Sequence, residues 1–255
     1  MVVSKHMRTY KLTIAYDGTR YQGWQRQPDT ELTIQGTLER TIYLLKGYSV
    51  EVNGSGRTDG GVHAKAQTAS IRLPGKIEED AFLKELNQML PEDIRVTDVE
   101  LVKNGFHARY SASGKQYEYT IDTGEKADVF TRKYCFHFPE YLDIQAMRAA
   151  AGCLIGKHDF AAFTDRNEEQ SAIRTIYDIQ ITEQGNKVKI LYAGNGFMYH
   201  MVRILTGTLL EVGTGKRTVA DTSALLEGGE RYQAGFLAPA CGLALKEVYY
   251  CLDKK

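Results

Sequence analysis

Apolar residues in the first hundred positions recur with the period of a strand in some segments and of a helix in others. From Thr9 to Tyr16 every second side chain is apolar or aromatic, which is typical of a strand with one buried face. From Thr33 to Lys46 the apolar residues instead follow a helical spacing, which predicts a helix that Thr33 caps and Gly47 ends. The same two patterns predict strands over residues 48–52, 67–73 and 94–102 and a helix over residues 78–90. The resulting order, β-α-β-β-α-β, is the ferredoxin-like arrangement.

The second half follows a related order of elements, although its sequence is different. Strands are expected over residues 115–121, 134–138, 173–181, 188–192 and 243–250, and helices over residues 144–154, 197–212 and 222–226. On the longest of these helices, Tyr199, His200 and Arg203 share one rim beside an apolar stripe. We therefore predict an α+β fold of two ferredoxin-like (RRM-like) halves, residues 1–104 and 105–255, packed around a central cleft. Such clefts commonly hold functional sites.

The charge balance narrows the classes of function. The 255 residues include 32 Lys and Arg and 32 Asp and Glu, so the formal net charge is zero. A wholly basic nucleic-acid coat protein and an acidic tail protein are thereby excluded, whereas a nucleic-acid enzyme needs only one basic face. No run of about 18 apolar residues predicts a transmembrane helix. The first seven residues lack the apolar core of a signal peptide, and Met7 is an alternative start of the natural chain.

Cysteine and histidine spacing argues against metal and disulfide chemistry. The four cysteines form no C-x-x-C pair, and the six histidines show no paired ligand spacing. We therefore expect free thiols in a reducing cytoplasm and no metal site.

The densest polar cluster runs from Asn53 to His63 and contains four glycines. Its glycine spacing misses the dinucleotide-binding fingerprint, and strands rather than a helix flank it. Arg57 and Asp59 are two residues apart, so on an extended segment they point the same way. A nearby cation keeps a carboxylate ionised, and an ionised carboxylate can act as a nucleophile or a base. The alternative interpretation is an ordinary hairpin loop with a surface salt bridge.

Three further segments, residues 16–27, 106–119 and 195–203, interleave aromatic residues, amides and cations. Such mixtures stack on bases and contact phosphates. Each also has a structural interpretation. Trp24 can fill the core beneath a loop, and Tyr117 and Tyr119, which share one face of a strand, can be core residues. The polar rim of the long helix can be an ordinary solvated face.

Together these segments resemble the TruA family of tRNA pseudouridine synthases over about residues 10–248, nearly the whole chain. The resemblance is carried by five motifs in the family's order: YDG…GWQRQ (16–27), GRTDGGVHA (56–64), FHARYSA…KQYEY (106–119), NGFMYHMVR (195–203) and APACGLAL (238–245). Two positions depart from the family pattern. Gly60 replaces the usual Ala and is expected to loosen the loop, and Ala244 replaces Tyr and removes bulk near the floor of the cleft. Neither departure removes a charged group.

The resemblance implies an enzyme that isomerises uridine to pseudouridine at positions 38, 39 and 40 of the tRNA anticodon stem-loop. It implies that no cofactor takes part, that the target base leaves the stack, and that the protein is a homodimer.

The resemblance also assigns roles to residues. Asp59 is the catalytic carboxylate at the ribose, either as nucleophile or as base, and Arg203 pairs with it. Arg57 helps to extrude and hold the nucleotide. Tyr117 stacks on the uracil, and Leu245 forms an apolar wall. RNA contacts are expected from Phe106, His107, Ala108, Arg109 and Tyr110, and from Arg20 and Arg26. With no net charge, binding requires a positive cleft, which we expect Arg20, Arg26, Arg57, Arg109 and Arg203 to line.

Three alternatives remain at this stage. A non-catalytic RNA-binding module would explain the aromatic residues and arginines, but not a glycine-framed Asp59. A nucleotide-using transferase would need the glycine-rich loops to hold phosphate. A paralogue with a different RNA target would share the chemistry.

Overall fold

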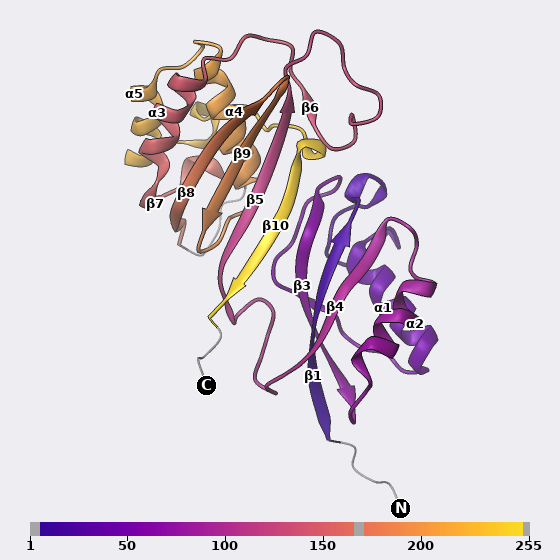
Figure 1. The fold of residues 1–255 in the computed structure, drawn as a ribbon. Coiled ribbons are helices and arrows are strands. Elements are labelled where there is room, and N and C mark those ends of the chain that lie inside the picture. The colour runs from indigo at the N-terminus through magenta and orange to yellow at the C-terminus, as the bar shows by residue number, and fades with distance from the viewer. Residues whose placement is uncertain (1–5, 166–170, 252–255) are drawn as a thin grey trace, which may run out of the picture. The chain divides into compact units, whose positions relative to one another are not determined.

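The computed structural model describes residues 6–165 and 171–251, which form two compact units (Figure 1). Unit 1 comprises Met1–Ser113 and Leu245–Lys255, and unit 2 comprises Gly114–Ala244. This division differs from the expected one at residue 104. The chain beyond residue 104 packs back onto unit 1, because the Ala108 N–H donates to Ser70 Oγ at 3.1 Å and the Ala108 carbonyl accepts from Tyr250 Oη at 2.7 Å. Most of the C-terminal strand, from Leu245 onward, also belongs to unit 1.

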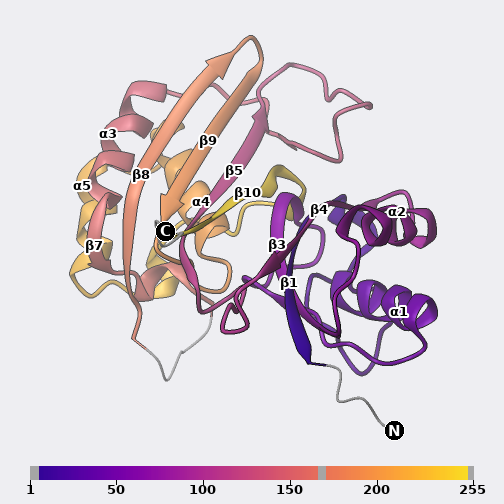
Figure 2. The ribbon, with the colours of Figure 1, turned by 60° about the horizontal axis from the view of Figure 1, so that its bottom comes forward.

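Unit 1 is a sheet with strand order β4-β1-β3-β10, and the short β2 pairs with β3. Its elements are β1 (Met7–Tyr16), a 3-10 turn (Gly18–Arg20), α1 (Ile34–Lys46), β2 (Asn53–Gly54), β3 (His63–Pro74), α2 (Glu79–Met89), β4 (Ile94–Val102) and β10 (Leu243–Tyr250). The predicted order β-α-β-β-α-β is confirmed. Figures 1 and 2 show α1 and α2 side by side on the same side of this sheet. Tyr10, Leu12 and Ile14 of β1 are fully buried, as their alternation predicts.

The prediction of a strand over residues 48–52 is wrong. Val50 and Val52 are buried, yet the backbone there is irregular and the pairing is confined to β2. The reason is a contact with another element, since the N–H of Val52 donates to Glu39 Oε1 on α1 at 3.1 Å instead of to a neighbouring strand.

The strands of unit 2 have the order β5-β9-β8-β7, and β6 pairs with β5. Its main elements are β5 (Ala112–Asp122), β6 (Phe136–His137), α3 (Ile144–Leu154), β7 (Gly156–Asp159), β8 (Ile173–Gln184), β9 (Lys187–Gly194), α4 (Met201–Gly213) and α5 (Val219–Ala224). Figures 1 and 2 show the three helices grouped on one side of the sheet. The sequence pattern did not predict β7. Because most of β10 is assigned to unit 1, unit 2 alone lacks the closing strand of the predicted β-α-β-β-α-β order.

The long helix of unit 2 begins later than the sequence pattern predicts. It starts at Met201, because the preceding His200 has a left-handed backbone with φ of 63°. His200 is the only non-glycine residue with positive φ in the described part of the chain. Tyr199 and His200 therefore precede the helix and do not share its rim with Arg203, which corrects the expected grouping.

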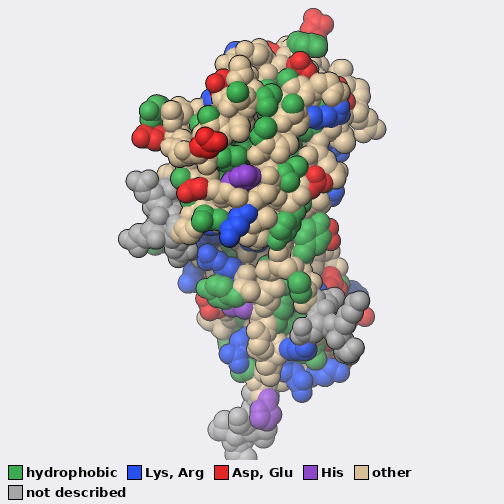
Figure 3. Space-filling view, turned by 90° about the vertical axis from the view of Figure 1, so that its left-hand side faces the viewer, with side chains coloured by type: hydrophobic (Ala, Val, Ile, Leu, Met, Phe, Trp, Pro, Cys, Tyr) green, Lys and Arg blue, Asp and Glu red, His purple; other side chains and the backbone are tan. Residues whose placement is uncertain are grey.

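Two further observations concern the length of the helices and the charge of the surface. Across residues 6–165 and 171–251, no helix combines the length and the apolar character needed to span a membrane. Figure 3 shows one face of the chain on which acidic and basic side chains are interspersed.

Helix α1 provides a stability test. The Thr33 side chain accepts from the Gly36 N–H at 3.2 Å, and Gly47 ends the helix with φ of 75°. We expect Thr33→Ala to lower the free energy of unfolding by about 1 kcal/mol, because a first-turn N–H loses its partner. Urea unfolding measures this. Thr33→Ser keeps the capping oxygen and serves as the control, and an equal loss in both variants would contradict the capping role.

Candidate functional site

The loop that carries Asp59 connects β2 to β3 and is attached to the segment around Trp24. The Trp24 N–H donates to the Thr58 carbonyl at 3.0 Å, and the Gly61 N–H donates to the Tyr21 carbonyl at 3.2 Å. Within the loop, the Val62 N–H donates to the Asp59 carbonyl at 3.2 Å, which closes a turn. Asp59 is half-buried at this turn. The loop is therefore fixed by backbone bonds on both sides of the carboxylate.

Buried polar groups form the floor under the loop. Thr58 is buried, and its hydroxyl lies 2.8 Å from Tyr16 Oη. Gln67, fully buried on β3, accepts from Ser55 Oγ at 2.6 Å and donates to the Gly56 carbonyl at 3.0 Å. Burial raises the pKa of Tyr16, so its hydroxyl keeps its proton at neutral pH. Satisfied buried networks of this kind impose a single local structure.

Trp24 is a core residue, which settles one of the alternatives in the sequence. Its side chain is only 2% exposed. It lies directly against Gly54, where an added Cβ would come within 2.5 Å of the indole ring. The segment around residues 16–27 therefore serves as a support for the Asp59 loop, and its tryptophan offers no surface to stack on a base.

Three arginines in these two loops were predicted to contact RNA or the nucleotide, and they have different partners. Arg20 Nε donates to Asp93 Oδ2 at 2.8 Å, and Arg26 Nη1 lies 3.1 Å from Glu39 Oε2. Both positive charges are therefore offset by a carboxylate of the same unit. Arg57 differs, because its Nε donates to the neutral amide oxygen of Gln25 at 3.0 Å.

The predicted RNA-contacting segment, residues 106–110, alternates between anchors and exposed groups. The ring of Phe106 packs on Tyr250 with centroids 5.0 Å apart, and Ala108 is fully buried. Arg109 is exposed and lies over the ring of Tyr110, which is 78% exposed. His107 is half-buried, and its ring also contacts the ring of Tyr110, at 4.4 Å. Three of the five residues thus form an aromatic and cationic cluster, and Phe106 and Ala108 hold it in place.

Two predicted substrate residues lie in unit 2. Tyr117 on β5 is 8% exposed and meets Phe197 edge to face, with centroids 5.2 Å apart. Arg203 lies in the first turn of α4, and its Nε donates to the Ala238 carbonyl at 2.7 Å. The predicted wall residue, Leu245, is fully buried in the unit 1 part of β10. The family departure Ala244 is half-buried at the end of unit 2.

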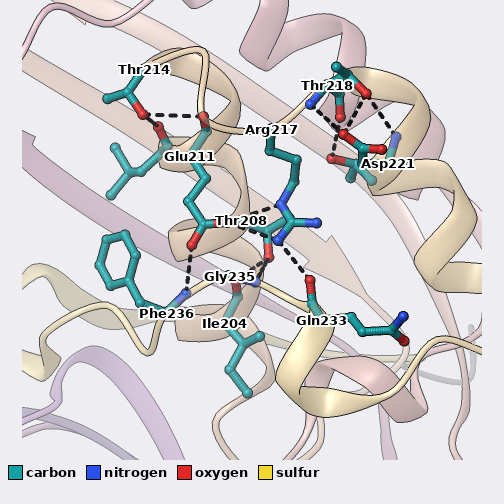
Figure 4. A network of polar contacts seen from close by, with 12 residues as sticks. Ile204, Thr208, Glu211, Thr214, Arg217, Thr218, Asp221, Gln233, Gly235 and Phe236 are labelled. Carbon is teal, nitrogen blue, oxygen red and sulfur yellow. Dashed lines mark hydrogen bonds and ion pairs between the residues drawn. The ribbon is translucent and has the colours of Figure 1, made fainter.

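A polar network fixes the segment that leads to Ala238 (Figure 4). Arg217 donates to Glu211 Oε2 through Nε and Nη2, at 3.0 and 2.9 Å, and to the Gln233 carbonyl at 2.7 Å. The Gly235 N–H donates to Thr208 Oγ1 of α4 at 3.0 Å. These bonds hold residues 233–236 along α4, so the carbonyl that orients Arg203 is itself positioned by the helix.

Ahead of α4, the strained residue His200 contacts the carboxylate of Asp165, which also accepts a hydrogen bond from Arg231. The His200 Nδ1 lies 2.5 Å from Asp165 Oδ2, and Arg231 Nε donates to Asp165 Oδ1 at 2.6 Å. Burial acts to raise the pKa of Asp165, but the hydrogen bonds from His200 and Arg231 outweigh it and keep the pKa below its ordinary value. Asp165 and Arg231 were not predicted, because they are distant in sequence and lie in no motif.

The support of Arg57 was missed too, although the sequence contains a signal for it. Gln35 and Glu39 are four residues apart on α1, a spacing at which helical side chains meet, and Gln35 is a polar residue at a buried position. Its amide accepts from Gln25 Nε2 at 2.6 Å.

The close packing of the two loops generates a paired glycine prediction. At Gly23, φ is 95° and an added Cβ would lie 2.6 Å from the Thr58 carbonyl oxygen, whereas at Gly60 the nearest atom would be 3.5 Å away. We expect Gly23→Ala to lower the thermal midpoint by displacing the Asp59 loop. Gly60→Ala should raise the stability by about 0.4–1 kcal/mol, because it restricts the unfolded chain. Differential scanning calorimetry of both variants checks this, and destabilisation by Gly60→Ala would show that the loop needs glycine there.

Comparisons with known proteins agree with the motifs. A family model described as tRNA pseudouridine synthase matches residues 12–111 and 150–251. A Lacticaseibacillus casei protein named tRNA pseudouridine synthase A is 44% identical over 248 residues, which cover 96% of this chain and 100% of that protein. One from Latilactobacillus sakei with the same name is 43% identical over 94% of this chain and 98% of its own length. Clostridium perfringens has a tRNA pseudouridine synthase A 2 that is 43% identical over 96% of this chain and all of its own.

The family match covers well over half of the chain, and the relatives match nearly its full length. The fold is of mixed α+β type, as predicted, and the enzyme class is that of an isomerase. The chain therefore belongs to the tRNA pseudouridine synthase family.

Proposed function

We propose that this isomerase converts uridine to pseudouridine at positions 38, 39 and 40 of the tRNA anticodon stem-loop, with Asp59 as the catalytic carboxylate. The names of the relatives support tRNA as the substrate. The observation that carries the role of Asp59 is its place on a turn fixed from both sides, by Trp24 to Thr58 and by Gly61 to Tyr21. A rigid support of this kind keeps a reacting group within the narrow range of productive positions.

The reaction rearranges bonds within one nucleotide. The bond between the ring nitrogen and the anomeric carbon breaks, the uracil turns, and its C5 bonds to the same carbon. The C5 proton leaves, and the freed ring nitrogen gains a proton in its place. Asp59 acts at the ribose in one of two ways. It attacks the anomeric carbon and is displaced again when C5 bonds to that carbon, or it removes a ribose proton and later returns it. Atoms and charge balance without an added reactant, which agrees with a reaction that needs no cofactor.

The remaining site residues carry the roles implied by the resemblance. Arg57 holds the extruded nucleotide, Tyr117 stacks on the uracil and its hydroxyl assists removal of the C5 proton. Arg203 pairs with Asp59, and Leu245 provides an apolar wall. Fixed support favours these roles for Tyr117 and Arg203, since Phe197 and the Ala238 carbonyl restrict their side chains. Extrusion of the base costs a few kcal/mol of stacking, which RNA contacts must offset.

The RNA contacts of the proposal divide by exposure. Among residues 106–110, His107, Arg109 and Tyr110 supply the contacting side chains, and Phe106 and Ala108 anchor them. Arg20 and Arg26 reach phosphates in competition with Asp93 and Glu39, so each contributes less to RNA binding than an exposed cation without an acidic partner. The proposal includes action as a homodimer in the cytoplasm, as the resemblance implies.

The decisive measurement is tritium release from an unmodified tRNA transcript labelled at uridine C5, without added cofactor. We expect release that maps to the anticodon arm, and a loss of more than about a thousandfold in Asp59→Ala, because the carboxylate acts at the reacting carbon. Asp98→Asn, an exposed carboxylate on β4, serves as the control and should retain full activity.

Two results would change the proposal. Release from total RNA but not from the anticodon arm would indicate a different RNA target. Full activity in Asp59→Ala would remove Asp59 from the chemistry.

A further inference from the structure

A chain of side-chain hydrogen bonds leads from helix α1 to Arg57, and all of its members lie in unit 1. Arg57 Nε donates to Gln25 Oε1 at 3.0 Å, Gln25 Nε2 donates to Gln35 Oε1 at 2.6 Å, and Gln35 Nε2 donates to Glu39 Oε1 at 3.0 Å. We call the chain Arg57–Gln25–Gln35–Glu39 the amide relay. It joins the Asp59 loop to the interior of a capped helix.

The direction of every bond in the amide relay is determined by its two ends. A carboxylate such as Glu39 only accepts, and a guanidinium such as Arg57 only donates. Gln35 must therefore turn its NH2 group to Glu39 and its oxygen to Gln25. Gln25 must then turn its NH2 group to Gln35 and its oxygen to Arg57. Neither amide can rotate by half a turn without placing two donors or two acceptors against each other.

Backbone contacts fix the middle of the relay independently. The Arg26 N–H donates to Gln35 Oε1 at 2.9 Å, which confirms the orientation of that amide. The Gln35 N–H donates to the Trp24 carbonyl at 2.9 Å. Glu39 is held in turn by the Val52 N–H at 3.1 Å and by Arg26 Nη1 at 3.1 Å. Gln35 itself is only 7% exposed, so water does not readily replace its partners.

We infer that Gln35, acting through Gln25, is a positioning residue for Arg57 and thus for the nucleotide that Arg57 holds; the catalytic consequence rests on the proposed function. Arg57 is exposed on its loop and long enough to occupy many rotamers. The bond through Nε restricts it while leaving both terminal NH2 groups outside this contact for a phosphate or a base. Because the restriction exists before RNA arrives, less side-chain entropy is lost on binding.

The first arm of the test measures Arg57 directly. We would record the heteronuclear NOE of arginine Nε–H groups in ¹⁵N-labelled protein without RNA, and assign the Arg57 signal by its loss in Arg57→Lys. The native signal should be as ordered as the backbone. Gln35→Met and Gln25→Met keep the side-chain length but remove the amide, and both should leave the Arg57 signal mobile. An Arg57 signal equally ordered in the native protein and both variants would overturn the inference.

Asn87 on α2 offers a matched control. Its amide donates to the Val96 carbonyl at 2.7 Å and accepts from the Val96 N–H at 2.9 Å, so Asn87→Leu removes two bonds of a helix-borne amide in unit 1, compared with three in Gln35→Met. It should lower stability without changing the Arg57 signal. A change there as large as in Gln35→Met would assign the effect to general loosening of unit 1 and overturn the inference.

The second arm measures catalysis with the tRNA transcript. Gln35→Met should reduce kcat/KM by about tenfold to a hundredfold, because a misplacement of about 1 Å can cost about a hundredfold, and Asn87→Leu should leave it unchanged. In an Arg57→Ala background, Gln35→Met should have no further effect, because the relay acts through Arg57. An equal further loss in that background would overturn the inference. If the native protein isomerises no uridine, the proposed function fails while the first arm still decides the relay.

Discussion

The loop that carries Asp59 keeps its shape through backbone hydrogen bonds to a second loop. Both segments are irregular, and a glycine-rich loop loses much conformational freedom when it becomes ordered. The bonds from Trp24 to Thr58 and from Gly61 to Tyr21 therefore have to be supplemented by burial. Trp24 provides the burial from one side, and the polar floor of Tyr16, Thr58 and Gln67 supports the loop from below. The position of Asp59 depends on these two loops folding together.

The position of Asp59 also depends on helix α1. The Ile34 and Gln35 N–H groups, which a first helical turn leaves without helical partners, donate to the carbonyls of Gly23 and Trp24 at 3.2 and 2.9 Å. The helix thereby fixes the supporting loop, and that loop fixes the Asp59 loop. A change in α1 can thus reach the candidate catalytic residue although no residue of α1 belongs to the predicted site.

The local sequence pattern predicted an element correctly where a single hydrophobic periodicity dominated. The alternation of β1 and the Thr33 cap of α1 were predictable, because each depends on a few neighbouring residues. The irregular backbone of residues 48–52 was not predictable, since the N–H of Val52 donates to a side chain of α1 that no local pattern reveals. The predicted start of α4 was wrong for a similar reason, because the left-handed His200 is bonded to Asp165, 35 positions away. The motifs located Asp59 and Arg57, but their supports, Gln67 and Gln35, required long-range contacts.

The partners of the arginines explain how a chain without net charge can present positive charge locally. Arg20 and Arg26 each meet a carboxylate, so they stabilise unit 1 while contributing little field outside it. Arg57 meets an amide instead. A carboxylate at position 25 would orient the guanidinium equally well, but it would offset the positive charge of Arg57. An amide supplies the directional acceptor without the opposing charge, and the chain of amides ending at Glu39 places the required carboxylate two side chains away. The orientation and the charge of Arg57, which is two residues from Asp59 in the sequence, are thus controlled separately.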